Sequence, residues 1–288
     1  MTGELQEKCA VAAVSMNPEA YEHETHDAAV NAASMVATQL FAQQHRGPKG
    51  TGIVAITHEG DFVERRTDGM VKDAYPKKHL RKLAGTVAIG HNRYATDGDK
   101  GCVPQPVIDA YIGLAVATNG NLPQTRVLRE HLQRRSIRTG KLIDVQLMTH
   151  ALAHNIRSGM RLADSVEDAY LHFRGAFSSV ALLGRESDES EMVAFRDKHG
   201  IRPLALGRFP GGLAVASETC GLDVIGAEYI REVEPGELIT IRGNEFESKQ
   251  LAEPDHKLDI FEMIYFASPA SKLYGERVNE VRYRSGVQ

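Results

Sequence analysis

A cysteine stands at the head of a short apolar stretch close to the start of the chain, and this feature constrains the fold more than any other. Cys9 is followed by the small residues Ala10 to Val14, a pattern that predicts a β-strand. If residues 1–8 are removed, Cys9 carries a free α-amine beside its thiol, so nucleophile and general base lie on one residue. The unperturbed pKa of an α-amine, roughly 7.7 to 8.0, suits that task. Taken alone, Cys9 is more typical of a buried thiol in a packed strand.

The composition is that of a globular protein with a substantial core. The chain has 288 residues, of which 42% are hydrophobic and 25% charged, and its net charge of −4 argues against a nucleic-acid partner. The N-terminal segment does not resemble a secretion signal, and the longest stretch without charge, 28–44, carries polar residues at intervals, so we predict no membrane span. The three scattered cysteines (Cys9, Cys102 and Cys220) suit a reducing compartment, and we predict a cytoplasmic protein.

Strand patterns, then helical patterns, then strand patterns again follow one another along the chain, which favours a single α+β layered domain. The first helix is expected to begin near Asp27, which could cap it, and to end by the His45–Pro48 turn. The other expected helices are 124–134, 144–157 and 162–173. The expected strands are 10–14, 52–56, 86–90, 113–117, 178–183, 192–195, 204–207, 213–217 and 238–241.

Two polar clusters follow expected strands, His91–Thr96 and Thr118–Leu122, where a scaffold can position loop side chains. Asn119-Gly120 is also a strong signal for a hairpin turn, and Asp144 could simply cap its helix. The His23–His26 cluster is one residue too short for the usual zinc-binding helix, so we predict no metal there. The sequence contains no phosphate-binding loop, no dinucleotide fingerprint and no hydrolase nucleophile elbow.

The separate pieces form an ordered set that resembles a known family. In chain order the set is Cys9, Gln44–Gly47, Gly90–Thr96, Asn119–Leu122, Arg196–Leu204, Ala216–Cys220 and Glu234–Glu237. It resembles the class II glutamine amidotransferase domain of amidophosphoribosyltransferases, an N-terminal nucleophile hydrolase, from Cys9 to about Pro269. The resemblance implies a four-layer αββα sandwich over residues 9–270, a propeptide-like segment 1–8 and a tail 271–288, where a synthase domain would otherwise begin.

The resemblance also implies a reaction, in which glutamine is hydrolysed to glutamate and ammonia through a γ-glutamyl thioester and no cofactor is needed. The implied catalytic residues are Cys9 as nucleophile, with the Asn119 side chain and the Gly120 N–H as donors to the oxyanion. The implied substrate-binding residues are Arg93 for the α-carboxylate, Asp144 for the α-ammonium, Arg46 and Gly47 in a mobile loop over the site, and Thr96 in its lining.

The sequence also departs from the family pattern. Ala10 follows the nucleophile where the family usually has glycine, and Thr118 replaces a histidine. Cys220 matches an iron–sulfur ligand of some members, but the other ligands are lacking, so we predict no cluster.

The family's phosphoribosyltransferase domain, with its sugar-pyrophosphate motif, is not found in this sequence, so complete amidophosphoribosyltransferase activity is not expected from it. The favoured function is a glutaminase domain that passes ammonia to a separate synthase or phosphoribosyltransferase subunit. A catalytically silent glutamine-binding regulatory module and a hydrolase of another small amide are the alternatives. The ammonia acceptor and the oligomeric state stay open, and a homo-oligomer is compatible with the sequence.

Overall fold

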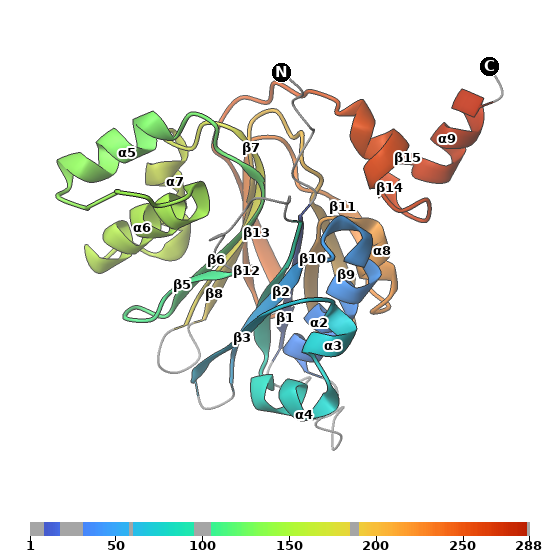
Figure 1. Ribbon diagram of the computed structural model, residues 1–288, viewed down its shortest axis with the longest axis horizontal. Coiled ribbons are helices and arrows are strands. Elements are labelled where there is room, and N and C mark those ends of the chain that lie inside the picture. The colour runs from blue at the N-terminus through green and yellow to red at the C-terminus, as the bar shows by residue number, and fades with distance from the viewer. Residues whose placement is uncertain (1–8, 18–30, 58–59, 95–104, 185–189, 287–288) are drawn as a thin grey trace.

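Two antiparallel β-sheets are stacked face to face, and helices cover the outer face of each (Figure 1). The computed structural model describes residues 9–17, 31–57, 60–94, 105–184 and 190–286. In order across the first sheet, the strands are β11 (Glu228–Glu232), β9 (Ala205–Phe209), β10 (Gly212–Ala216), β1 (Ala10–Met16), β4 (Val87–Arg93), β2 (Gly50–Ile56) and β3 (Phe62–Asp68). In order across the second sheet, they are β13 (Glu245–Gln250), β12 (Glu237–Arg242), β8 (Glu191–Arg196), β7 (Ala176–Leu183), β6 (Leu114–Asn121) and β5 (Val107–Asp109).

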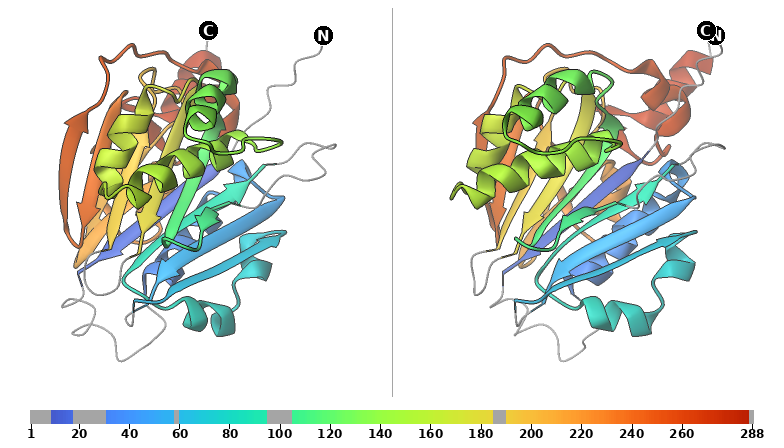
Figure 2. Two further views of the ribbon diagram at one scale, coloured as in Figure 1. Left: turned by 90° about the vertical axis from the view of Figure 1, so that its left-hand side faces the viewer. Right: turned by 60° about the vertical axis from the view of Figure 1, so that its left-hand side comes forward.

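The helices form the two outer layers of the sandwich (Figure 2). On the first sheet lie α2 (Ala32–Ala42), α3 (Val71–Ala74), α4 (Lys77–Leu80) and α8 (Thr219–Asp223), with the 3-10 turns η1 (Gln44–Arg46) and η2 (Arg81–Leu83). On the second sheet lie α5 (Thr125–Arg134), α6 (Asp144–Arg157) and α7 (Leu162–Tyr170). The four-layer αββα arrangement predicted from the sequence is therefore confirmed.

The small residues of β1 are explained by its place in the middle of the sandwich. Val11 and Ala13 pack between the two sheets, whereas Ala12 and Val14 face the helical layer that contains α2. All four side chains are completely buried, since successive residues of a strand point to opposite faces and both faces are covered here.

The chain ends in a small subdomain at one edge of the sandwich (Figure 1). It contains the π-helical turn η3 (Glu262–Phe266), a hairpin of β14 (Lys272–Leu273) and β15 (Glu276–Arg277), and α9 (Val278–Gly286). Met263, Leu273 and Val278 form its core. The proposed boundary near residue 270 falls inside this subdomain, and the division into 1–8, 9–270 and 271–288 stays a prediction.

The secondary structure differs from expectation in two respects that affect the site. The helix expected to start near Asp27 is α2, the first helix of the described residues, and it begins at Ala32, because Asn31 accepts from the Ser34 N–H and the Ser34 hydroxyl accepts from the Asn31 N–H, each at 3.0 Å. Asp27 itself lies outside the described residues. The hairpin-turn alternative for Asn119-Gly120 was wrong, because both residues lie inside β6, paired with β7. The described part of the chain has no helix long and apolar enough to cross a membrane.

Candidate active site

Cys9 lies where β1 begins, beside the end of β4. Ala10 is paired with Asn92, so the antiparallel register brings Cys9 next to Arg93. Gly47 packs directly on this part of β4, because a Cβ at Gly47 would lie only 2.6 Å from the Asn92 carbonyl carbon. The structure therefore brings together Cys9, Arg93 and Gly47, three of the residues that the sequence predicted for one site.

Asn119 and Gly120 lie near the end of β6, in the facing sheet. Asn119 is completely buried, and neither atom of its side-chain amide has a hydrogen-bond partner among the described residues. A buried amide left in this state costs about 1–3 kcal/mol, and such groups call for a functional explanation. Gly120 has φ +108°, and a Cβ there would lie 2.1 Å from the Ala176 carbonyl oxygen, so no other residue fits.

A single hydrogen bond shows that these two groups of residues lie at the same edge of the sandwich. His91 Nε2 donates to the Thr118 carbonyl oxygen at 3.2 Å and joins β4 to β6. Arg93 follows His91 by two positions and Asn119 follows Thr118 by one, so both polar strand ends lie on this side. Burial lowers the pKa of His91 to about 3, so the imidazole is neutral and joins the sheets as a donor rather than as a general base.

Asp144 lies just beyond the end of β6, in the first turn of α6. Its Oδ2 accepts from the Leu122 N–H at 3.0 Å and its Oδ1 from the Val145 N–H at 2.7 Å. The capping alternative was wrong in position, because Ile143 is the N-cap and Asp144 the first helical residue. Each carboxylate oxygen keeps a lone pair, so Asp144 can accept from a substrate ammonium while the two backbone donors hold it in place.

Arg46 is the most constrained charged residue near Cys9. Its Nε donates to the Cys9 carbonyl oxygen at 3.0 Å, its Nη1 to Glu218 at 2.7 Å, and both its Nη atoms to Glu262 at 2.9 Å. The guanidinium is completely buried, and burial acts to lower its pKa, but Glu262 and Glu218 outweigh that effect and raise the pKa of Arg46 above its usual value. In this site Arg46 therefore contacts the backbone of Cys9. Direct contact between Arg46 and glutamine stays a prediction.

Glu218 connects this network to the C-terminal subdomain. Besides Arg46, it accepts from His45 at 2.9 Å, the Ser268 N–H at 2.8 Å and the Ser271 hydroxyl at 2.7 Å. Burial alone would raise the pKa of Glu218, but the hydrogen bond from His45 and the charge of Arg46 lower it to about 2. The carboxylate is therefore ionised at every pH at which the protein is normally handled.

Sequence reasoning missed Glu262 and gave no role to Glu218. One signal was present for Glu262, which is a lone acid between the apolar residues of Ile260–Ile264. A carboxylate in such a run is rarely buried unless a cation pairs with it. Nothing local could identify Arg46 as that cation, because the two residues are 216 positions apart.

The two departures from the family pattern are accommodated without an orphaned group. Ala10 is completely buried in β1. The Thr118 hydroxyl lies 3.0 Å from the Ser179 hydroxyl, and the Thr118 N–H donates to the Gln105 side chain at 2.7 Å.

The remaining candidates are either outside the described residues or unsuited to the chemistry. Thr96, Cys102 and the His23–His26 cluster lie outside the described residues. Within the described residues, no group of three metal-binding side chains lies together. Cys220 is a free thiol whose pKa burial raises to about 12, so it is protonated and a poor nucleophile.

Comparisons with known proteins bear on the family and the fold. A family model described as a glutamine amidotransferase domain matches residues 91–223. The chain is 36% identical to the amidophosphoribosyltransferase of Synechococcus elongatus over 263 residues, which is 88% of this chain and 52% of that protein. It is 35% identical to the Bacillus subtilis enzyme over 254 residues, 86% of this chain and 51% of that protein. The chain thus spans about half the length of these relatives.

The solved structures show the same relationship. The glutamine phosphoribosylpyrophosphate amidotransferase of B. subtilis, complexed with ADP and GMP, superposes with a TM-score of 0.80 at 29% identity, over 96% of this chain and 57% of that one. A structure described as the allosteric regulatory enzyme of purine biosynthesis gives a TM-score of 0.81 at 30% identity over the same shares. The four-layer fold is thereby that of the N-terminal nucleophile hydrolases, as predicted. The chain belongs to the class II glutamine amidotransferase domains, of the type found in amidophosphoribosyltransferases.

Proposed function

We propose that this domain hydrolyses glutamine to glutamate and ammonia through a thioester on Cys9. The observation that carries the proposal is the buried Asn119 amide, which has no partner among the described residues and lies next to Gly120 with its positive φ. Donors arranged in advance for an oxyanion lack an internal acceptor, because their acceptor forms only during the reaction. A strand residue whose amide served only packing would have been paired or replaced by an apolar side chain.

In the proposed mechanism the thiol of Cys9 attacks the side-chain amide carbon of glutamine. The α-amine of Cys9, freed by removal of residues 1–8, takes the thiol proton and passes it to the departing ammonia. The Asn119 side chain and the Gly120 N–H stabilise the tetrahedral oxyanion, a contribution of about 3–4 kcal/mol for one such donor. Water then attacks the thioester carbon, so that glutamate leaves and the thiol is regenerated.

Arg93 and Asp144 hold the head group of the substrate in this scheme. A guanidinium fork pairs with an α-carboxylate, and a carboxylate with an α-ammonium, so the two charges select an α-amino acid. Arg93 reaches the site from β4 and Asp144 from the start of α6, so the head group would lie between the two sheets' polar ends. Gly47 and Thr96 are expected to complete the lining.

The test is glutamate and ammonia production by the purified protein, combined with its intact mass. Cys9→Ala should abolish turnover, whereas Cys220→Ala, the matched loss of the other described thiol, should leave it within about twofold of wild type. Loss of residues 1–8 in the mass spectrum should accompany activity. Wild-type protein with Cys9 at its N-terminus that binds glutamine without hydrolysing it would refute the proposal and favour the silent regulatory module.

We also propose that the ammonia passes to a phosphoribosyltransferase that docks on an apolar surface beside this site. We call the exposed side chains Leu258, Ile260, Phe261, Ile264 and Tyr265 the C-terminal apolar surface. Tyr265 is 69% exposed, and its ring stacks on that of Phe261 at 5.9 Å between centroids. Exposed apolar clusters mark interaction sites. About half of each relative lies outside the region that matches this chain, and a protein similar to that half could be the partner.

This surface is directly connected to the nucleophile. Glu262 belongs to the same segment of the chain, but its side chain is buried and accepts a hydrogen bond from Arg46. Arg46 in turn donates to the Cys9 carbonyl oxygen. A structural change caused by docking could therefore be transmitted to Cys9 through two contacts, from Glu262 to Arg46 and from Arg46 to Cys9.

The docking proposal is tested with a phosphoribosyltransferase of the source organism, supplied with the sugar pyrophosphate and either glutamine or ammonium chloride. Ile264→Asp should reduce the glutamine-dependent reaction and leave the ammonium-dependent one unchanged. Leu171→Asp, which alters an exposed leucine in the helical layer on the second sheet, is the matched control and should change neither. Equal behaviour of the two variants would exclude this surface. The cytoplasmic location also stays a prediction.

A further inference from the structure

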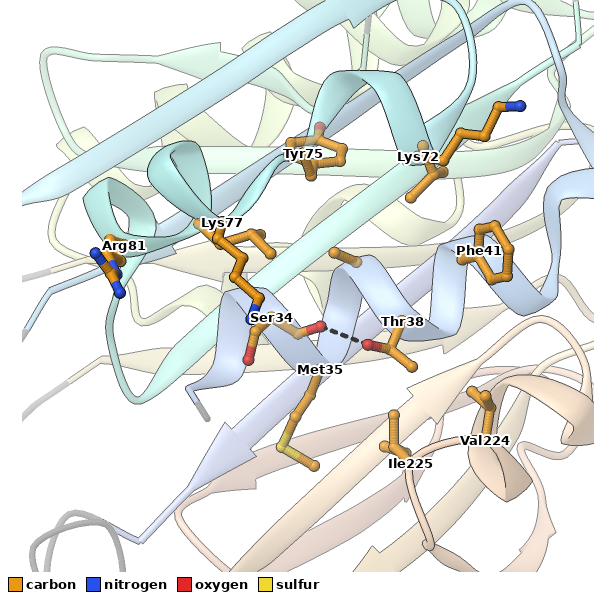
Figure 3. Close-up of a pocket in the computed structure, with 13 residues that line it drawn as sticks. Ser34, Met35, Thr38, Phe41, Lys72, Tyr75, Lys77, Arg81, Val224 and Ile225 are labelled. Atoms are coloured by element: carbon orange, nitrogen blue, oxygen red, sulfur yellow. Dashed lines mark hydrogen bonds between the residues drawn. The ribbon is translucent and has the colours of Figure 1, made fainter. Parts of the chain in front are cut away.

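A groove lies on the outer side of α2, in the helical layer of the first sheet and outside the site described above (Figure 3). One wall is the exposed face of α2, and the opposite wall is formed by α3, α4 and the start of η2. Val224 and Ile225, at the end of α8, line the groove from the side of α2 away from α3 and α4 (Figure 3). The volume of the groove is about 610 Å³, within the range of roughly 300–1,000 Å³ that is typical of small-molecule sites.

The groove has an apolar interior that solvent reaches. Met35 and Phe41 come from α2, Leu80 from α4 and Ile225 from the turn after α8. Phe41 is 55% exposed and the other three are half-buried. Covering such side chains is favourable by about 25 cal/mol for each Å² of apolar surface removed from water, so the interior favours an apolar body.

The charge of the groove has a single sign. Lys72, Lys77 and Arg81 line it, and no aspartate or glutamate does. None of the three cations has a salt bridge within the described part of the chain. In Figure 3 the side chain of Lys77 extends across the opening toward Ser34 on α2, while Arg81 lies at the same end of the groove. Uncompensated positive charge beside an apolar interior is complementary to a molecule with an apolar body and an anionic end.

We propose that this groove is a second binding site, which takes a small amphiphilic anion: an aromatic or aliphatic body that carries one carboxylate, sulfonate or phosphate. The body lies over Met35, Phe41 and Ile225, and the anionic group lies between Lys77 and Arg81. The volume of the groove, about 610 Å³, fits a small molecule. The site requires nothing from Cys9 and is independent of the proposed glutaminase activity.

The test is a fluorescence titration with 8-anilinonaphthalene-1-sulfonate, which has this chemistry, and with its uncharged counterpart N-phenyl-1-naphthylamine. The variant Lys77→Gln/Arg81→Gln removes the two cations that hold the anion. The matched control Lys78→Gln/Lys82→Gln removes the same charge from the same segment, but neither residue lines the groove. Thr38→Trp fills the groove from an exposed position of α2. Probe bound at the C-terminal apolar surface is common to all variants and cancels in the comparison.

The expected result is that Lys77→Gln/Arg81→Gln weakens sulfonate binding by about fivefold or more, whereas Lys78→Gln/Lys82→Gln binds as wild type does. Thr38→Trp should remove the groove component for both probes. Equal sulfonate affinities in the two double variants, or unchanged binding in Thr38→Trp, would overturn the proposal. Self-association of the wild type that Thr38→Trp abolishes would also overturn it, because the groove would then be an interface between copies.

Discussion

Replacement of Arg46 by lysine is the most informative single change near the nucleophile. Lysine keeps the positive charge but has one nitrogen, whereas Arg46 uses three nitrogens in four hydrogen bonds to Cys9, Glu218 and Glu262. The ammonium cannot reach all three acceptors from one position. We therefore expect Arg46→Lys to destabilise the protein and to disturb the Cys9 backbone together.

The size of the expected loss in the free energy of unfolding depends on which hydrogen bonds Glu218 and Glu262 keep when Arg46 is replaced. Glu218 keeps its hydrogen bonds from His45, Ser268 and Ser271, so its carboxylate stays satisfied. Among the described residues, Glu262 keeps only the hydrogen bond from Arg202 at 3.2 Å, and its side chain has no exposed surface. A buried ion pair that loses one partner costs about 3–5 kcal/mol, and we expect Arg46→Lys to lie at the lower end, because its charge remains.

The assay is the free energy of unfolding in urea at neutral pH, measured by circular dichroism. Arg126→Lys is the matched control, because Arg126 pairs with Glu130 at 2.7 Å but is 89% exposed, and no measurable change in stability is expected there. A loss below about 1 kcal/mol for Arg46→Lys would refute the reasoning, since it would mean that the buried network contributes no more than a surface pair.

Three further outcomes are expected from changes at the strand ends. Asn119→Leu should raise or preserve the free energy of unfolding while abolishing glutamine hydrolysis, whereas Asn155→Leu, which removes a buried amide bonded at 2.9 Å to Asp168, should destabilise by about 1–3 kcal/mol in the same urea assay. Gly120→Ala should give at most a small soluble yield, because its Cβ would overlap the neighbouring strand; wild-type melting of this variant would contradict the structure. His91 has a folded pKa of about 3 against its ordinary 6.5, so the stability that it contributes is complete above pH 6.5 and is lost as pH falls toward 3. Between pH 6.5 and about 4.5, the free energy of unfolding should fall by about 2–3 kcal/mol more in wild type than in His91→Gln, and equal slopes would exclude this role.

The elements that the sequence predicted best are those with a strong local period. The predicted helix 144–157 has its observed bounds because its apolar residues recur along one face. β4 and β6 were predicted too short, since their last residues are polar. A strand in the middle of a sheet continues for as long as neighbouring backbone can pair with it, whatever its side chains, and β4 has neighbours on both sides up to Asn92.

The site was partly predictable for a related reason. Cys9, Arg93, Asn119 and Gly120 stand in an ordered motif, and the structure places them near strand ends of the two facing sheets. The partnership of Arg46 with Glu262 has no local signature, because it depends on how the C-terminal subdomain folds back on η1. Sequence reasoning therefore named the residues proposed to contact substrate, and Arg46 among them, but it did not identify the buried acids that hold Arg46 against the nucleophile.

Arg46 and Asn119 are both buried polar side chains, but they differ in their partners, and the difference supports the ligand position proposed above. Arg46 has a protein acceptor for each of its three nitrogens, so its burial is compensated within the chain. Asn119, equally buried, has none among the described residues, so the folded chain carries an unmet cost of about 1–3 kcal/mol that only a bound oxygen or solvent can offset. A fold selected for stability alone would place leucine at this position. The asparagine at this position is the physical reason to propose that the negative charge of the proposed reaction develops at Asn119, whereas Arg46 stabilises the fold.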